Sequence, residues 1–175
     1  MVAIVVSEEQ IDLEGGCVSS RGSGAVNYLF DQQHGGIGVV VRDSNGIVRL
    51  YASKVLEAGF SPSLAESVAI HSGMLLAAES GLLPAMVESN AQSVINLILA
   101  GNSICSEIGL VIDDILDLKS WFDFTCFFFF FALRSSNRVA HCLAKMTLVH
   151  ALDVVMFKEA LPGLQSLVRE EAIVS

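Results

Sequence analysis

The apolar run from Cys126 to Leu133 most strongly limits the folds that this chain can adopt. It is the longest uninterrupted apolar run, and it contains five consecutive phenylalanines in only eight residues. A membrane-crossing helix needs about 20 apolar residues, so the run predicts a buried central strand of a sheet. A platform of aromatic rings for stacking bases is the alternative, and the absence of interleaved polar or basic residues disfavours it.

The order of the other segments predicts an α/β domain with a mixed sheet. Three strand-like segments come first and form an antiparallel meander, with an Asp-Ser-Asn-Gly turn between the second and the third. A strand between helices then follows, which gives the order β-β-β-α-β-α-α-β-α. We expect strands at 25–30, 35–41, 47–53, 84–88 and 123–133, and helices at 63–80, 91–100, 103–120, 137–150 and 163–172.

The first of these helices has clear boundary signals. Ser63 and Glu66 fit a capping box, in which each side chain binds a backbone amide at the start of the helix. Gly81 follows the last helical residue and predicts its end.

The length of 175 residues suits one domain. Residues 1–24 show no sustained period and include a run rich in glycine and serine, so we expect a flexible lead-in and a domain at 25–172. Met1–Val6 is apolar but lacks a basic leading region and is shorter than the apolar core of a signal peptide. The default expectation is therefore a soluble intracellular protein without a membrane partner.

The balance of charge limits the affinity for nucleic acids. Nineteen acidic residues against ten basic ones give a net charge of −9. Lysine and arginine supply most of the sequence-independent affinity for phosphates. Any binding of nucleic acid is therefore expected to be weak.

Three segments, taken together, resemble a known family. They are the Gly-Gly-Ile-Gly-Val-Val-Val-Arg-Asp stretch at 35–43, Val-Glu-Ser-Asn-Ala-Gln at 87–92 and Arg-Ser-Ser-Asn-Arg-Val-Ala-His at 134–141. In this order, and with the Ala65-Glu66 helix between the first two, they resemble the type 1 ribonuclease H domain, most closely its plant retroelement-derived, reverse-transcriptase-like branch. The resemblance implies a three-layer fold with a mixed five-stranded sheet.

The resemblance also implies a chemistry, the hydrolysis of the RNA strand of RNA/DNA hybrids. In the family, four carboxylates hold two Mg²⁺ ions, which activate water and stabilise the departing oxygen. Mg²⁺ would therefore be the cofactor of an active protein. Without those anions, no metal is expected to bind stably.

The first family carboxylate falls on a neutral residue. Depending on where a short gap is placed, Leu29 or Asn27 occupies its position. Asp31 lies two residues after Leu29, on the same face of the expected strand, and could act as a substitute metal ligand only if the strand shifts its register. The other interpretation of Asp31 is a solvated turn residue.

The remaining three positions retain one acid. Glu66 matches the second carboxylate, although its capping role competes for the same side chain. Asn90 stands where an aspartate is expected, and its amide oxygen cannot offset the charge of a metal. Glu88 precedes it by two residues and is interpreted as a solvated acid. His141 occupies the fourth position, as a weak metal ligand, a substrate contact or a partly exposed helix residue.

These residues predict a ribonuclease H-like domain with a degenerate catalytic set and little or no hydrolysis. Weak contacts with a hybrid are expected from Arg134, Asn137, Arg138 and Lys145. Two alternatives stay open. One is an active metal-dependent hybrid endoribonuclease, and the other is a protein-interaction module or a decayed retroelement fragment.

Overall fold

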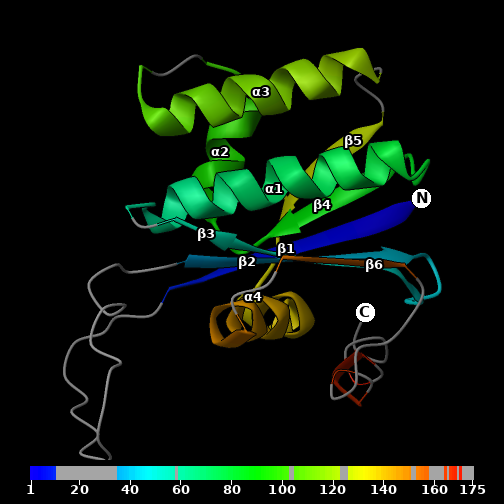
Figure 1. The fold of residues 1–175 in the computed structure, drawn as a ribbon. Coiled ribbons are helices and arrows are strands. Elements are labelled where there is room, and N and C mark those ends of the chain that lie inside the picture. Colours follow the sequence, from blue (N-terminus) through cyan, green and yellow to red (C-terminus); the bar gives the residue numbers. More distant parts are fainter. Residues whose placement is uncertain are drawn as a thin grey trace, which may run out of the picture.

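The structure, a computed structural model, describes residues 1–10, 35–57, 59–102, 105–122, 126–150, 153–157, 164, 166–168 and 170. They form a six-stranded mixed sheet in the order β5-β4-β1-β2-β3-β6 (Figure 1). The strands are β1 (Val2–Gln10), β2 (Gly35–Asp43), β3 (Val48–Leu56), β4 (Ala85–Ser89), β5 (Phe127–Phe131) and β6 (Val154–Phe157). The helices are α1 (Pro62–Glu79), α2 (Gln92–Ala100), α3 (Glu107–Trp121) and α4 (Arg138–His150), with a 3₁₀ turn at Arg134–Ser136.

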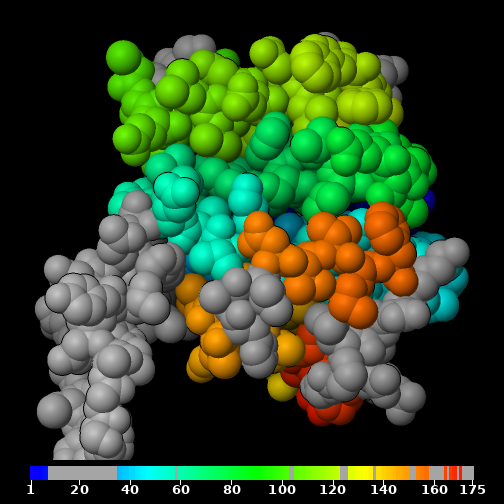
Figure 2. Space-filling model, in the orientation of Figure 1, coloured from blue at the N-terminus to red at the C-terminus, as the bar shows by residue number. Residues whose placement is uncertain are grey.

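Helices cover both faces of the sheet. α1 packs on β1, β2 and β4, α3 lies outside α1, and α2 contacts β5. α4 covers β1, β2 and β3 from the other side, so the sheet lies between two helical layers (Figure 1). In the same orientation, Figure 2 shows the side chains of α3 at the top and those of α1 below them. Among the described residues, none of the helices has the length and apolarity that a membrane crossing requires.

The central strand differs from the sequence-based expectation. β1 is antiparallel to β2 and parallel to β4, and its residues Ile4, Val5 and Val6 are buried. The interpretation of residues 1–24 as a flexible lead-in is therefore wrong for residues 2–10. Their run of β-branched side chains suits a strand that is covered on both faces. The expected first strand at 25–30 lies outside the described residues.

Two glycines of β2 allow α4 to approach the sheet closely. A Cβ atom on Gly38 would lie 2.0 Å from the carbonyl oxygen of Ala140, and one on Gly36 would lie 2.4 Å from that of Ala144. Any side chain at these positions would separate the helix from the strand. The glycines thereby set the position of α4, whose first residues carry the segment at 134–141.

The start of α1 also corrects an expectation. The helix begins at Pro62, and the N-cap is Ser61, whose Oγ accepts a hydrogen bond from the Leu64 amide at 3.2 Å. Proline suits the first helical position because its φ is already fixed and no N–H is needed there. The proposed Ser63–Glu66 capping box is therefore absent. Glu66 is left available for another contact.

The phenylalanine run is not a central strand. β5 is the last strand of the sheet on one side, and Phe127 and Phe129 are buried while Phe128, Phe130 and Phe131 are exposed. Alternation of side chains along a strand places Phe128 and Phe130 on the same side of the sheet as α4. α4 packs on β1, β2 and β3 and does not cover this part of the sheet. At the other side, β6 adds a sixth strand next to β3 that the sequence-based expectation did not include.

Candidate carboxylate site and nucleic-acid interface

Glu66 lies inside the protein, between α1 and the end of β4. Its side chain is 1% exposed, and its Oε1 accepts a hydrogen bond from the hydroxyl of Ser89 at 2.5 Å. The Oγ of Ser89 in turn accepts a hydrogen bond from the Ala91 amide at 3.0 Å, just before α2. Sequence reasoning missed Ser89, although it precedes Asn90 in the motif at 87–92. The contact joins Glu66 to the residue just before Asn90, at the carboxyl end of β4.

Two amide side chains lie at the same end of the sheet. Asn137 is fully buried, and its Nδ2 donates a hydrogen bond to the carbonyl oxygen of Val6 on β1 at 3.2 Å. β1 runs parallel to β4, with Val5 paired to Glu88, so Val6 lies beside the end of β4. The buried Oδ1 atoms of Asn90 and Asn137 find no donor in the part of the chain that the structure describes. They offer neutral acceptor oxygens and no negative charge.

His141 lies on α4 against an arginine. A guanidinium nitrogen of Arg134 is 3.1 Å from Nδ1 and 3.3 Å from Nε2 of His141. Arginine can only donate in such a contact, so the imidazole nitrogen must accept. The guanidinium also places a positive charge beside the ring. This environment disfavours a metal cation at His141.

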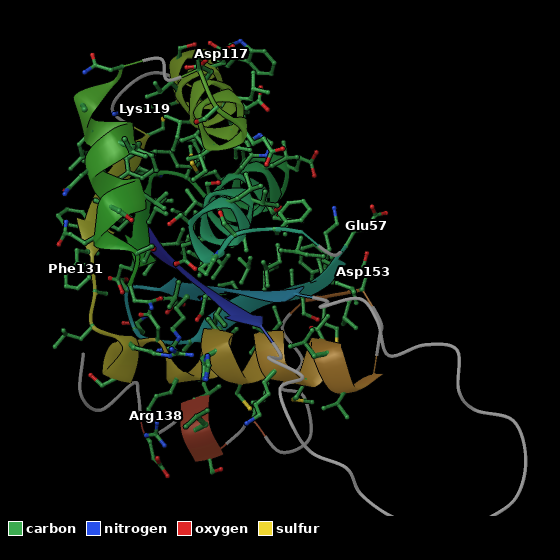
Figure 3. The ribbon with its side chains drawn as sticks, turned by 90° about the vertical axis from the view of Figure 1, so that its left-hand side faces the viewer. Glu57, Asp117, Lys119, Phe131, Arg138 and Asp153 are labelled. Carbon is green, nitrogen blue, oxygen red and sulfur yellow. The ribbon has the colours of Figure 1, made fainter. Side chains whose placement is uncertain are left out.

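The expected basic face is present only in part. Arg138 and Lys145 are exposed on α4 and, with His141, follow helical spacing along one side. Arg138 forms an exposed ion pair with Glu170 at 3.1 Å. Figure 3 shows Arg138 beside α4. Asn137 is buried and ties α4 to β1, so its side chain is not part of this surface.

The other sequence-predicted positions do not join Glu66. Asn27, Leu29 and Asp31 lie outside the described residues. Glu88 is half-buried and neighbours Ser89 on β4, so the alternation of the strand directs it to the opposite face from Glu66. β1 contributes the buried Ser7 and then continues through Glu8 and Glu9, acids that sequence reasoning left in the lead-in.

The described residues do not fit a pair of Mg²⁺ ions. Among them, no group of three His, Cys, Asp or Glu side chains is arranged to hold a metal ion. Glu66 brings one carboxylate, while Asn90 and Asn137 bring neutral oxygens. Two divalent ions need several anionic ligands, because each anion offsets part of the metal charge.

The structure also contains a cavity of about 240 Å³ between α1 and the strands β2, β3 and β6. Apolar side chains and Ser53, Lys54, Ser72 and Asp153 line it. None of the residues discussed above belongs to its lining. Asp153 adjoins β6, at the opposite edge of the sheet from Phe131 on β5 (Figure 3).

Comparison with known proteins identifies a family and a fold. The family model described as reverse transcriptase-like matches residues 23–147, a range that begins after β1. No curated protein sequence matches the chain.

Several solved structures share the fold. Ribonuclease H1 of the archaeon Halobacterium salinarum superposes with a TM-score of 0.64 at 16% identity, covering 85% of this chain and 98% of its own. LC11 ribonuclease H1, solved in complex with an RNA/DNA hybrid, superposes with a TM-score of 0.65 at 17% identity, covering 86% of this chain and 99% of its own. The N-terminal ribonuclease H domain of rv2228c from Mycobacterium tuberculosis superposes with a TM-score of 0.63 at 18% identity, covering 86% of this chain and 94% of its own. The predicted α/β three-layer fold is thus confirmed, with six strands in the sheet.

Proposed function

We propose, from the premise that the chain belongs to the reverse transcriptase-like family and has a ribonuclease H-like fold, that it contacts nucleic acid weakly and hydrolyses RNA/DNA hybrids little or not at all. The observation that carries the proposal is the surroundings of the Glu66 carboxylate. The retained acid is buried and hydrogen-bonded to Ser89, and the family positions that follow it are Asn90 and His141.

The small number of negative charges around Glu66 supports the proposal that hydrolysis is weak or absent. A metal at Glu66 would meet one carboxylate and the neutral oxygens of asparagines, and at His141 it would meet the guanidinium of Arg134. In the family, the bound Mg²⁺ ions would supply the activation of water. The side chains of this chain supply hydrogen bonds that hold α1, β4 and α4 together.

The surface of α4 supports a contact with phosphates. Arg134 and Arg138 are exposed where α4 begins, near the carboxyl end of β4, and Lys145 is exposed two turns further along α4. The guanidinium group can bind phosphate oxygens in pairs, and the lysine ammonium adds a point charge. LC11 ribonuclease H1 was solved with an RNA/DNA hybrid, which makes a hybrid the first ligand to test here.

Hydrolysis is tested with a labelled RNA/DNA hybrid in the presence of Mg²⁺ or Mn²⁺. We expect no cleavage above that of a sample containing a chelator, because the site lacks the charge to hold two metal ions. Ribonuclease H1 of Halobacterium salinarum serves as the positive control. Cleavage by the wild type that disappears in Glu66→Gln would refute the proposal.

A further inference from the structure

Within the described part of the chain, β5 is an edge strand. β4 pairs with one edge of β5 from Ala85 to Ser89, and no strand of the described residues pairs with the other. Phe131 lies at the outer margin of the protein in Figure 3. A strand with one unpaired edge presents a row of backbone N–H and C=O groups to any chain that can pair with it.

Apolar side chains surround this edge. Phe128, Phe130, Phe131 and Leu133 are 43%, 48%, 44% and 65% exposed, and they form what we call the β5 patch. Phe128 and Phe130 lie on the α4 side of the sheet, and they stay exposed because α4 packs on β1, β2 and β3. We call this part of the sheet surface the open face. Several exposed apolar side chains along one strand are typical of a surface that another molecule covers.

The edge lacks the features that normally keep strands apart. Natural sheets protect their edges with charged residues, proline or bulges. From Cys126 to Leu133 there is no charged residue, proline or glycine. β6 at the opposite edge is shorter, and the charged residues Asp153 and Lys158 adjoin it in the sequence. Association through an edge is therefore expected at β5.

The occupant that fits the β5 patch best is a second copy of the chain. The strand is its own complement, because antiparallel pairing with another β5 places phenylalanines opposite phenylalanines, and cross-strand aromatic pairs are favourable. The net charge of −9 opposes contact between copies at most surfaces. β5 itself carries no charge that would oppose it there.

A nucleic acid fits the same surface less well. Stacking platforms combine aromatic rings with basic side chains that follow the phosphates. Here the residue paired with Phe130 on β4 is Glu88, which shares the open face. An acid therefore stands beside the exposed rings where a stacking platform has a basic side chain.

We propose that the protein forms a symmetric dimer in which the β5 edges of two copies pair antiparallel, joining their sheets into one. The pairing occupies the β5 edge of each copy, so assembly through β5 stops at two copies. Phe128 and Phe130 of each copy then bury their exposed faces against the partner.

Sedimentation velocity over a concentration series tests this proposal. We expect the mass to rise from 18.7 kDa toward twice that value as the concentration increases. Phe130→Lys places a charge on the open face and should raise the protein concentration at the midpoint of association by at least about tenfold. Phe157→Lys, on β6 and exposed to a similar degree at 56%, is the matched control and should dimerise like the wild type. Circular dichroism checks that both variants fold.

Hydrogen exchange of the β5 amides provides a second measurement. Protection of these amides should increase with concentration in the wild type and in Phe157→Lys. A mass of 18.7 kDa at every concentration would overturn the proposal, as would dissociation caused by Phe157→Lys but not by Phe130→Lys. A monomer whose affinity for a single-stranded oligonucleotide falls in Phe130→Lys would assign the patch to nucleic acid instead.

Discussion

The hydroxyl of Ser89 holds the buried carboxylate of Glu66 in place. It donates to Glu66 Oε1 and accepts from the Ala91 amide, so one small side chain connects α1, β4 and the start of α2. All of these groups are buried or half-buried, where an unmade hydrogen bond is costly. A carboxylate used in this way contributes to stability whether or not the protein hydrolyses hybrids.

Removal of this hydroxyl is expected to destabilise the protein. Ser89→Ala should lower the free energy of unfolding by about 1–3 kcal/mol, because it leaves Oε1 of Glu66 and the Ala91 amide without this partner. Urea denaturation measures the change. Ser93→Ala, at an exposed position of α2, is the control and should be nearly neutral. Equal stability of the two variants would contradict the structural role of Ser89.

At the scale of elements, the position of α4 depends on glycine. The helix that carries His141 rests on β2 at Gly36 and Gly38, where a Cβ would meet backbone atoms of Ala144 and Ala140. Backbone atoms cannot move away as the end of a flexible side chain can. Widening this contact would also strain the hydrogen bond from Asn137 to Val6.

A methyl group on this strand should therefore be poorly tolerated. Gly38→Ala is expected to cost about 3 kcal/mol of stability, at the upper end of overpacking effects, since its Cβ would lie 2.0 Å from the Ala140 oxygen. Lys54→Ala on the neighbouring strand β3 is exposed and should change stability little. Thermal and urea unfolding of both variants decide the matter. A neutral Gly38→Ala would mean that α4 does not pack this closely.

The first strand provides the sharpest test of an element. β1 occupies the centre of the sheet, although the family match begins only at residue 23. Deletion of residues 1–10 should abolish cooperative unfolding, because Ile4, Val5 and Val6 leave the core and β2 and β4 lose their common neighbour. Deletion of residues 171–175 is the control. A cooperatively folded protein without residues 1–10 would show that another segment, such as 25–30, can serve as the central strand.

At the scale of the whole molecule, charge limits what the protein can bind. The net charge is −9, and the exposed cations at the proposed interface are Arg134, Arg138 and Lys145. Arg138 is paired with Glu170 in addition. Affinity for a polyanion depends on the number of phosphates that such side chains neutralise.

Binding of a hybrid should accordingly depend only mildly on salt. With at most three phosphate contacts, the slope of log K against log salt is expected to be no steeper than about −3. Fluorescence anisotropy with a labelled hybrid at low salt measures it. Lys145→Ala should reduce the slope by about 1, whereas Lys54→Ala on β3 should leave it unchanged. A slope much steeper than this, or no binding at low salt, would contradict the proposed interface.

The sequence by itself determined the class of the fold and most of its elements. Helical periodicity places α2, α3 and α4 within a few residues of the expected ranges, and the meander of β2 and β3 follows from their apolar runs and the turn between them. The assignment of Glu66 as the retained family acid comes from the sequence and stays a prediction. These features depend on local interactions and on patterns that neighbouring residues share.

Only the tertiary structure decided which segments meet. It selected Val2–Gln10 as the central strand, moved the phenylalanine run to an edge and joined Ser89 to Glu66. Each outcome rests on contacts between residues far apart in the chain, and several segments have the apolar composition that a strand requires. The position of a strand in a sheet depends on which neighbours bury it, and that competition is settled by the packing of the whole molecule.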